Sequence, residues 1–323
     1  METIKKVQLR HLGKTDILVS PVGLGVMEFA GGGGLIGRMF PVIPQNEKNA
    51  IIKAALDGGI NWFDTAEIYG SGVSEKSLVA GLRAAGKSDQ EVIIATKWQP
   101  FLRTAGNIRQ SIESRLHYLD GFSIGNYLVH HPYSFSSPEA EMNAMADLVE
   151  AGKIRSVGVS NFNPARMRRA HATLAKRGIP LAVNQVLYSL LNREIETNGV
   201  LDTARELGVT ITAYTPVARD LLTGKYHKDP GLLTNLSGWR KASILRNLER
   251  SRPLITTMEE IATQYEATIA QVALNWLINF NGKIVVTIPG ATKVHQAEEN
   301  AGAMKFRLSD DELVRLADVS HRL

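Results

Sequence analysis

Short apolar runs alternate with longer amphipathic stretches along almost the whole chain, and this alternation limits the possible folds more than any other feature. The runs are rich in β-branched residues and are apolar throughout, without alternating polar positions. This is typical of parallel strands covered by helices on both faces. We therefore expect eight strands, at Val22–Met27, Ile60–Phe63, Val92–Thr96, Gly125–Val129, Ser156–Val159, Ala182–Gln185, Thr210–Tyr214 and Ile284–Ile288.

The stretches between these runs have helical patterning and recognisable helix starts. Two residue pairs have the spacing of a capping box, Thr257 with Glu260 and Ser309 with Glu312. Eight strands that alternate with helices predict an α/β fold, a single (β/α)8 TIM barrel that forms one domain over residues 1–323. A doubly wound sheet is the alternative, but it would rarely need eight units in one uninterrupted series.

Two segments depart from the simple alternation. Near the N-terminus, Val7–Leu9 and Leu18–Ser20 flank a turn, and we expect them to form a β-hairpin that plugs the bottom of the barrel. The connection between the seventh and eighth strands is about 70 residues long. Connections of this length usually act as lids or binding loops.

The glycine-rich segment Gly32–Gly37 matches the pattern G-x-G-x-x-G. That pattern binds a dinucleotide only where it follows a strand and opens a helix. Pro41 and Pro44 come before any helix can start. We therefore interpret the segment as a loop over the barrel mouth.

Composition and charge exclude several classes of protein. Charged residues make up 21% of the chain and the formal net charge is +5, without a run rich in Lys and Arg. This predicts a mild preference for anionic ligands and no nucleic-acid partner. The absence of Cys excludes thiolate catalysis and thiolate metal sites and fits a cytoplasmic protein. No apolar run reaches about 18 residues, so no membrane partner is expected. No metal site is expected either, and nothing in the sequence indicates an oligomeric state.

Polar side chains stand where the second, third and fourth predicted strands end. Asp64 ends the second strand and is followed by Tyr69, Lys97 follows the third, and His130 follows the fourth. Active sites of barrel enzymes lie at the carboxyl ends of the strands. An Asp in such a place is often only a helix cap, and a Tyr only packs, but four such groups on adjacent strand ends indicate a site.

The chemistry of this set can be derived from its residue types. We expect the ammonium group of Lys97 to lower the pKa of Tyr69, and Asp64 to hold Lys97 and balance its buried charge. Tyr69 would then act as a general acid toward a developing alkoxide. His130 would hydrogen-bond the same oxygen. A proton donor without a nucleophile or a metal fits carbonyl reduction, with hydride from a cofactor.

These residues lie in segments that resemble the aldo-keto reductase family. The strings GINWFDTAEIYGSGVSE, VIIATKW, YLVHHP, IRSVGVSNF, VNQVLYSLL, YTPVARDLLTGKY and IPGATKVHQAEENAGA occur in the family's order over nearly the whole chain. The resemblance implies a catalytic tetrad of Asp64, Tyr69, Lys97 and His130. It selects His130 because this residue precedes the proline by two positions, and we interpret His131 as a spacer or surface residue.

The resemblance also implies a nicotinamide cofactor site. Ser160, Asn161 and Gln185 would bind the carboxamide, and Tyr214 would stack on the ring unless it is a core residue. Some branches of the family place Arg where this chain has Gln296, so Lys293, with Lys241 or Arg240, would bind a 2′-phosphate and favour NADPH over NADH. The other implied contacts are Gly25, Val26, Met27 and Asp64, then Thr215, Pro216, Val217, Ala218, Arg219, Leu221 and Lys225, then Gly290, Thr292, Glu299 and Asn300.

The leading functional prediction is NADPH-dependent reduction of a small aldehyde or ketone to an alcohol. An NADPH-binding, redox-sensing regulatory subunit resembling channel-associated β subunits is the alternative. A Schiff-base aldolase that uses Lys97 is weaker, because it leaves Asp64 and Tyr69 without a role. Four apolar residues are predicted to wall the substrate pocket, with core or lid packing as their alternative: Met27, Phe29, Trp98 and Trp239.

Overall fold

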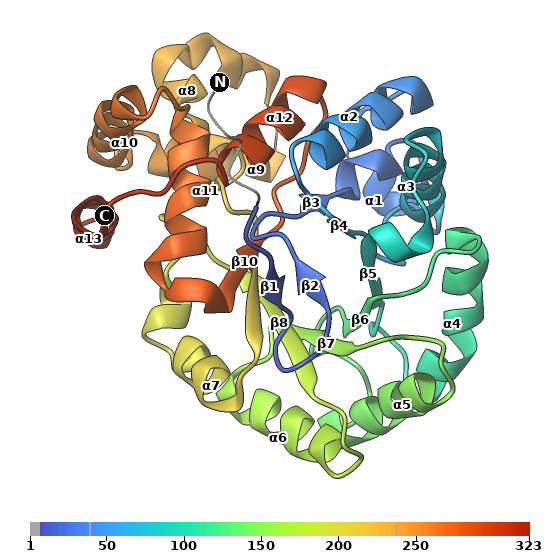
Figure 1. Cartoon of the computed structure of the whole chain (residues 1–323). Coiled ribbons are helices and arrows are strands. Elements are labelled where there is room, and N and C mark those ends of the chain that lie inside the picture. The colour runs from blue at the N-terminus through green and yellow to red at the C-terminus, as the bar shows by residue number, and fades with distance from the viewer. Residues whose placement is uncertain (1–6, 39, 237) are drawn as a thin grey trace.

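A ring of parallel strands surrounded by helices forms the body of the molecule (Figure 1). The structure is a computed structural model that describes residues 7–38, 40–236 and 238–323. Eight strands pair in parallel in their chain order, from β3 to β10. Two parallel bridges join the first to the last, Val22 with Thr287 and Gly25 with Gly290, and close the sheet into a barrel.

All eight predicted strands are confirmed. They are β3 (Leu24–Gly25), β4 (Trp62–Asp64), β5 (Ile93–Trp98), β6 (Asn126–Val129), β7 (Val157–Ser160), β8 (Leu181–Leu187), β9 (Thr210–Tyr214) and β10 (Val285–Thr287). Met27, expected at the end of the first strand, instead begins a short 3₁₀ helix. The (β/α)8 barrel prediction is therefore confirmed.

Helices fill the connections and cover the outside of the barrel (Figure 1). The predicted capping box at Ser309 and Glu312 is confirmed. The one at Thr257 and Glu260 is wrong, because both residues lie inside a helix that has already begun at Arg252. The helices are α1 (Gly34–Gly37), α2 (Gln45–Asp57), α3 (Val73–Ala84), α4 (Gly106–Leu119), α5 (Pro138–Glu150), α6 (Pro164–Ala175), α7 (Val200–Leu207), α8 (Lys225–Lys228), α9 (Gly238–Leu248), α10 (Arg252–Gln264), α11 (Ile269–Phe280), α12 (Val294–Gly302) and α13 (Asp310–His321), with 3₁₀ turns η1 (Met27–Ala30), η2 (Asp89–Glu91), η3 (Glu194–Glu196), η4 (Leu221–Thr223), η5 (Pro230–Asn235) and η6 (Gly282–Ile284).

A β-hairpin closes the end of the barrel where the strands begin. Its strands are β1 (Arg10–His11) and β2 (Leu18–Val19), so the first lies a little later in the chain than predicted. Gly13 N donates to Thr210 Oγ1 at 2.7 Å, at the start of β9. The apolar side chains of the hairpin pack with inward-facing side chains of the barrel. The bottom is therefore plugged, and the opposite end is left for a site.

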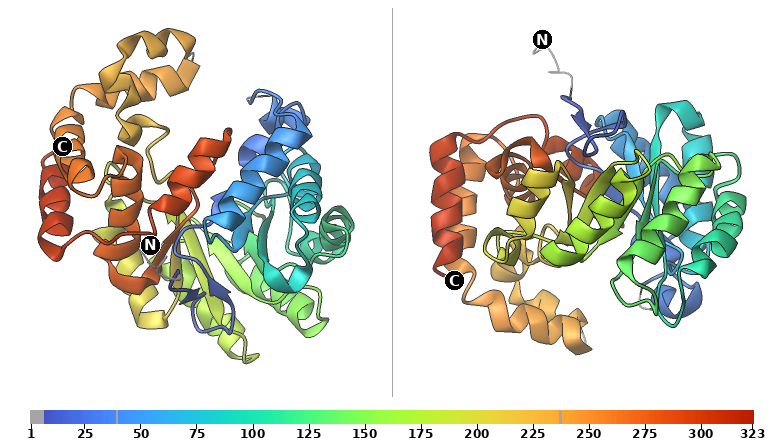
Figure 2. Two further views of the ribbon diagram at one scale, coloured as in Figure 1. Left: turned by 45° about the horizontal axis from the view of Figure 1, so that its top comes forward. Right: turned by 90° about the horizontal axis from the view of Figure 1, so that it is seen from below.

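The described part of the connection from β9 to β10 contains the four helices α8 to α11 and the 3₁₀ turns η4, η5 and η6, and α10 and α11 are its longest helices. Its first part, around α8 and α9, projects from the barrel (Figure 2) and has a small apolar cluster of its own. The cluster includes Leu221, Tyr226 and Ile244. The connection is thus more ordered than a plain loop.

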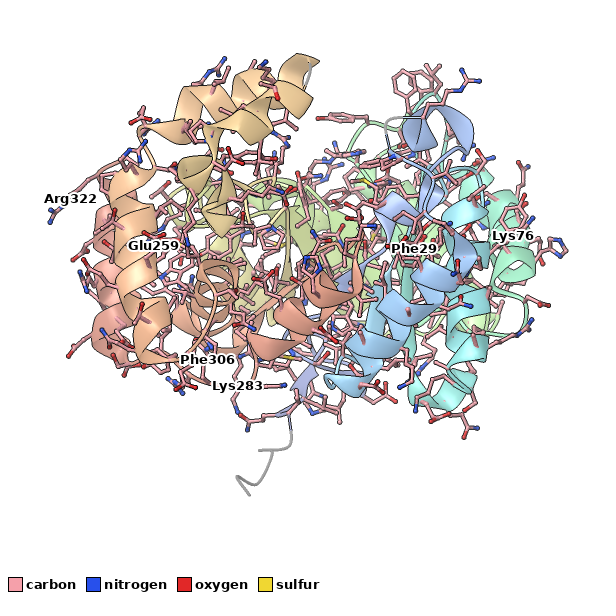
Figure 3. All side chains as sticks on the ribbon, turned by 90° about the horizontal axis from the view of Figure 1, so that it is seen from above. Phe29, Lys76, Glu259, Lys283, Phe306 and Arg322 are labelled. Carbon is pink, nitrogen blue, oxygen red and sulfur yellow. The ribbon has the colours of Figure 1, made fainter. Side chains whose placement is uncertain are left out.

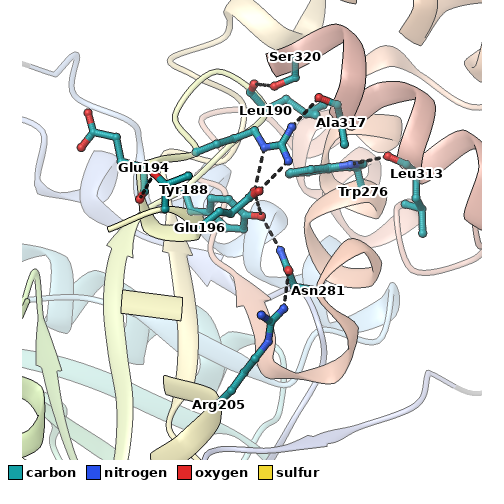
Figure 4. Close-up of polar contacts among 12 residues, drawn as sticks. Tyr188, Leu190, Glu194, Glu196, Arg205, Trp276, Asn281, Leu313, Ala317 and Ser320 are labelled. Atoms are coloured by element: carbon teal, nitrogen blue, oxygen red, sulfur yellow. Dashed lines mark hydrogen bonds and ion pairs between the residues drawn. The ribbon is translucent and has the colours of Figure 1, made fainter. Parts of the chain in front are cut away.

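A buried polar network ties the C-terminal helix α13 to the barrel (Figure 4). Tyr188, just after β8, donates to Glu196 Oε1 at 2.6 Å, and Arg193 donates to the carbonyl of Ala317 at 2.6 Å. Ser320 donates to the carbonyl of Leu190. These bonds lie away from the ends of β4, β5 and β6, so we assign this network to the scaffold.

The Gly32–Gly37 segment forms the single turn α1 and not the start of a long helix. A Cβ at Gly33 would lie 3.2 Å from Gly70 Cα, in the turn that follows Tyr69. Gly33 therefore permits close packing against that turn. None of the described helices combines the length and apolar character needed to cross a membrane.

Candidate active site

A buried ion pair forms the centre of the site. Asp64 ends β4 and lies opposite Ala95 of β5, and Lys97 is two residues further along β5. Side chains two apart on a strand share a face, so both groups point into the barrel. Lys97 has no exposed surface; its ammonium group donates to Asp64 and, at 2.8 Å, to the carbonyl of Thr65. Burial lowers the pKa of Lys97, and Asp64 opposes that shift.

Tyr69 and His130 lie beside this pair. The Lys97 Nζ atom is 5.1 Å from the centre of the Tyr69 ring. The rings of Tyr69 and His130 meet edge to face, with their centres 5.8 Å apart. The four residues therefore converge at the carboxyl ends of β4, β5 and β6.

The lowered pKa expected for Tyr69 is wrong, because the net shift is upward. Burial raises the pKa of Tyr69 well above its usual range, and the negative charges of Asp64 and Glu28 add to the effect. Lys97 does not reverse the shift because Asp64, in direct contact, balances its charge. The phenol is therefore protonated throughout the neutral pH range.

His130 is a neutral imidazole in this environment. Burial lowers its pKa well below the usual range, and the charge of Lys97 and the neighbouring His131 contribute. Within the described residues, its buried Nδ1 atom has no hydrogen-bond partner. A buried polar atom without a partner costs free energy. His130 is thus suited to hydrogen-bond a ligand.

A group of amide and hydroxyl side chains lies next to the ion pair. Gln185, in β8, donates from Nε2 to Asp64 Oδ2 at 2.9 Å, and Ser160, at the end of β7, donates to the carbonyl of Gln185 at 2.9 Å. The amide of Asn161 donates to Ser160 Oγ at 3.1 Å, and Tyr214 donates to Asn161 Oδ1 at 3.1 Å. These bonds form one continuous network with the Asp64–Lys97 pair.

The segment after β9 follows a strained path. Four of its residues have positive φ, namely Thr215 (55°), Ala218 (48°), Arg219 (57°) and Asp220 (71°). Left-handed backbone is unfavourable for residues other than Gly and collects at functional sites. Lys225 pairs with Asp220 at 2.7 Å, and Leu221 is buried in the apolar cluster of the connection. The predicted contacts Pro216 and Val217 lie in the same segment, and Lys241 is half-buried in α9.

At the start of α12, several residues predicted to contact the dinucleotide form hydrogen bonds with one another. Gln296 Oε1 accepts from Thr292 N at 2.7 Å and from Lys293 N at 3.1 Å. The Lys293 ammonium group pairs with Glu47 of α2 at 2.7 Å. Asn300 donates to the carbonyl of Gly290 at 3.1 Å, and Glu299, one residue earlier, is half-buried.

The first strand brings its predicted residues to the same end of the barrel. Gly25 bridges to Gly290, and Val26 N donates to the carbonyl of Asp64 at 2.9 Å. Met27 is half-buried at the start of η1. The Glu28 carboxylate lies against Gly290, within 2.7 Å of where a Cβ would stand. Sequence reasoning did not select Glu28.

Two of the predicted pocket walls are fully buried, which agrees with their alternative role in core packing. Trp98 is fully buried and its indole donates to Asn107 of α4 at 3.0 Å. It follows the inward-pointing Lys97, so it faces the helices. Phe29 is also fully buried, and Figure 3 shows it inside the molecule, in contrast to the outward-pointing Lys76. The side chains of Trp239 and Arg240 lie outside the described part of the structure.

Exposed apolar side chains on the loops after β5 and β6 were missed from sequence. They are Phe101, Leu102, Tyr133 and Phe135, each more than 60% exposed. Phe135 N donates to the carbonyl of Arg103 at 2.9 Å, which joins the two loops. The sequence does contain a signal that could have identified them, since they are apolar residues in the polar, proline-containing segments directly after Lys97 and His130.

Comparisons with known proteins point to one family. The model of the "Aldo/keto reductase family" matches residues 21–321. An uncharacterized oxidoreductase of Mycobacterium tuberculosis is 36% identical over 305 residues, which cover 94% of this chain and 90% of that protein. The chloroplastic pyridoxal reductase of Arabidopsis thaliana is 33% identical over 311 residues, covering 92% and 82%.

A solved structure is similar over almost its whole length. It is a thermostable aldo-keto reductase in complex with the inhibitor epalrestat, with a TM-score of 0.77, 29% identity, and coverage of 97% of this chain and 99% of that one. Across the described ranges, no group of three or more His, Asp or Glu residues is arranged to hold a metal ion. With the family model matching nearly every residue, this chain belongs to the aldo/keto reductase family and is an NAD(P)H-dependent oxidoreductase.

Proposed function

We propose that this chain reduces aldehydes or ketones to alcohols, with NADPH as the preferred cofactor and Tyr69 as the proton donor. The observation that carries the proposal is the convergence of a protonated phenol, a buried ammonium–carboxylate pair and a neutral imidazole on adjacent strand ends. Carbonyl reduction needs a proton at the oxygen while hydride reaches the carbon, and these groups supply the proton.

Each residue has a distinct part in this proposal. His130 orients the carbonyl oxygen, using a ring that burial keeps neutral. Tyr69 donates its proton to that oxygen as negative charge develops there. The ammonium group of Lys97, close to the ring, stabilises the phenolate that remains. Asp64 fixes Lys97 and balances its charge in the resting site.

The residues around the site fit a nicotinamide dinucleotide. Ser160, Asn161 and Gln185 place amide and hydroxyl groups together, and a carboxamide needs both a donor and an acceptor. Tyr214, half-buried beside them, offers an aromatic surface. When bound, the reduced nicotinamide supplies the hydride.

The other end of the dinucleotide would lie along the segment after β9 and at the start of α12. A helix N-terminus favours anions through its backbone N–H groups and its dipole. Thr292 and Lys293 stand at that N-terminus, and Lys293 carries the charge that a 2′-phosphate would meet. This is the basis for preferring NADPH over NADH.

The test is a fluorescence titration with NADPH and NADH, followed by oxidation of the bound cofactor by a panel of carbonyl compounds. The panel includes pyridoxal, because the Arabidopsis relative is a pyridoxal reductase. We expect tighter binding of NADPH and carbonyl-dependent oxidation. Tight binding without oxidation by any member of the panel would contradict the reductase hypothesis and favour the redox-sensing subunit. Absence of binding would refute both hypotheses.

A further inference from the structure

His131 stacks on two aromatic rings next to the proposed site, and it is only half-buried. Its ring stacks on His130 with centres 4.6 Å apart and planes within 6° of parallel. It also stacks on the ring of Tyr133, with centres 5.7 Å apart and planes at 20° to each other. His131 therefore has two stacked aromatic neighbours, where the sequence predicted a spacer or surface residue.

The edge of the His131 ring meets Asn161. The distance from His131 Nδ1 to Asn161 Nδ2 is 3.3 Å. The neighbouring bonds determine which end of the amide faces His131. Ser160 Oγ uses its proton on the carbonyl of Gln185, so it can only accept from Asn161, and the NH₂ group must lie on that side. Asn161 Oδ1 then accepts from Tyr214.

The donor and acceptor capacity of Asn161 follows from these bonds. One amide proton goes to Ser160 and the other to His131, and one lone pair of Oδ1 is used by Tyr214. The second lone pair of Oδ1 remains for a ligand. Asn161 therefore offers an acceptor, which suits the NH₂ group of a carboxamide.

We propose that His131 is a positioning residue, which accepts a hydrogen bond from Asn161 and so holds the Asn161 amide with its oxygen toward the nicotinamide carboxamide. This inference rests on the proposed function. Without an acceptor at position 131, the second amide proton has no partner there, and only Ser160 and Tyr214 still hold the Asn161 amide. Cofactor affinity then falls, while the proton donor Tyr69 is not affected.

The protonation state of His131 agrees with this role. Accepting at Nδ1 requires that Nδ1 carry no proton. Burial lowers the pKa of His131, and the charge of Lys97 lowers it further. The titratable groups that face it are His130 and Lys97 from the ends of β6 and β5, Tyr133 from its own loop, and Tyr214 across Asn161. Nδ1 is therefore free to accept near neutral pH and becomes blocked in acid.

Two substitutions separate the hydrogen bond from the packing. His131→Phe keeps a stacking ring and removes the acceptor, whereas His131→Asn keeps an acceptor near the position of Nδ1. The dissociation constants for NADPH and NADH are measured by fluorescence titration, and kcat is measured at saturating cofactor. We expect His131→Phe to weaken both dinucleotides by about 3–10-fold, the range for one hydrogen bond, with kcat within about twofold. His131→Asn should stay within about twofold of wild type in affinity.

A pH profile provides the readout that packing alone would not change. Wild-type affinity should fall in acid, as Nδ1 takes up a proton, whereas His131→Phe should lack that part of the profile. Unchanged affinity in His131→Phe would overturn the inference. Equal losses in both variants, with a lower melting temperature, would also overturn it and leave a packing role. If the wild-type chain binds neither dinucleotide, the proposed function fails as well. If the wild-type chain binds and turns over, and His131→Phe has the wild-type dissociation constants, only the role of His131 is contradicted.

Discussion

The two ends of the proposed dinucleotide site are built differently. At the strand ends, Asp64, Lys97 and Gln185 are buried and joined by hydrogen bonds. At the start of α12, the ion pair of Lys293 with Glu47 is exposed, with 57% and 30% of the side chains accessible. Charge removed from water must keep its partner, whereas exposed charges are screened and can exchange partners. The buried end is thus suited to fix reaction geometry, and the exposed end to adjust affinity.

The largest effect is expected from breaking the buried pair. Lys97→Met leaves Asp64 buried without its cation, so the free energy of unfolding should fall by about 3–5 kcal/mol. Chemical denaturation of wild type and variant measures the difference. The double variant Asp64→Asn with Lys97→Met serves as the control, since it removes both charges and should recover part of the loss. A change below about 1 kcal/mol in Lys97→Met would mean that the buried end behaves like an exposed one.

Removal of the proton donor should act on turnover and not on binding. Tyr69→Phe keeps the ring and removes the hydroxyl, so carbonyl-dependent oxidation of NADPH should slow by about 10²-fold or more. The dissociation constant for NADPH should stay at the wild-type value, because the hydroxyl has no part in holding the dinucleotide. Turnover measured at saturating cofactor, with titration alongside, tests both statements. A variant with the wild-type rate would remove Tyr69 from the mechanism.

A buried carboxyl behind the site should give stability a distinct pH dependence. Glu75 of α3 accepts from Thr96 at 2.9 Å and pairs with Arg115 at 2.9 Å, and burial raises its pKa to about 7 against the opposing charge of Arg115. Between the ordinary value of 4.5 and about 7, the folded state holds a proton that the unfolded chain releases. The contribution of Glu75 to stability therefore falls as pH rises through this window and is level above it.

Glu75→Gln should remove this contribution, which approaches about 1 kcal/mol per pH unit. Denaturation of both proteins at several pH values between 4.5 and 8 measures it. The difference between the two slopes isolates Glu75 from His130 and His131, whose lowered pKa values act in the opposite direction. Identical slopes in the two proteins would show that Glu75 is ionised throughout.

The exposed end should give the smallest effects, confined to one cofactor. Lys293→Met should weaken NADPH by about tenfold, as expected for loss of a charged hydrogen bond, and leave NADH nearly unchanged. Glu47→Gln should act in the opposite direction, tightening NADPH by about 2–5-fold, because it frees Lys293 from an exposed ion pair. Parallel titrations with the two cofactors measure both changes. Equal effects on NADPH and NADH would place the 2′-phosphate elsewhere.

Local sequence patterns were enough to predict the architecture and the position of the candidate site. The eight strands were recognisable because a buried parallel strand is a short continuous apolar run, a property of neighbouring residues. The same runs placed Asp64, Lys97 and His130 at strand ends, where barrel sites lie. Helix starts were less secure. Thr257 has the spacing of a cap, but its helix begins earlier, at Arg252.

Only the tertiary structure decided how these side chains are surrounded. The raised pKa of Tyr69 depends on burial and on Asp64 and Glu28, which come from different strand ends. The pairing of Lys293 with Glu47 joins residues 246 positions apart. Burial, charge balance and hydrogen-bond partners arise from contacts between distant segments, and no local pattern encodes them. The sequence by itself therefore determined the barrel and the residues at its rim, and the folded chain decided their charge states and their partners.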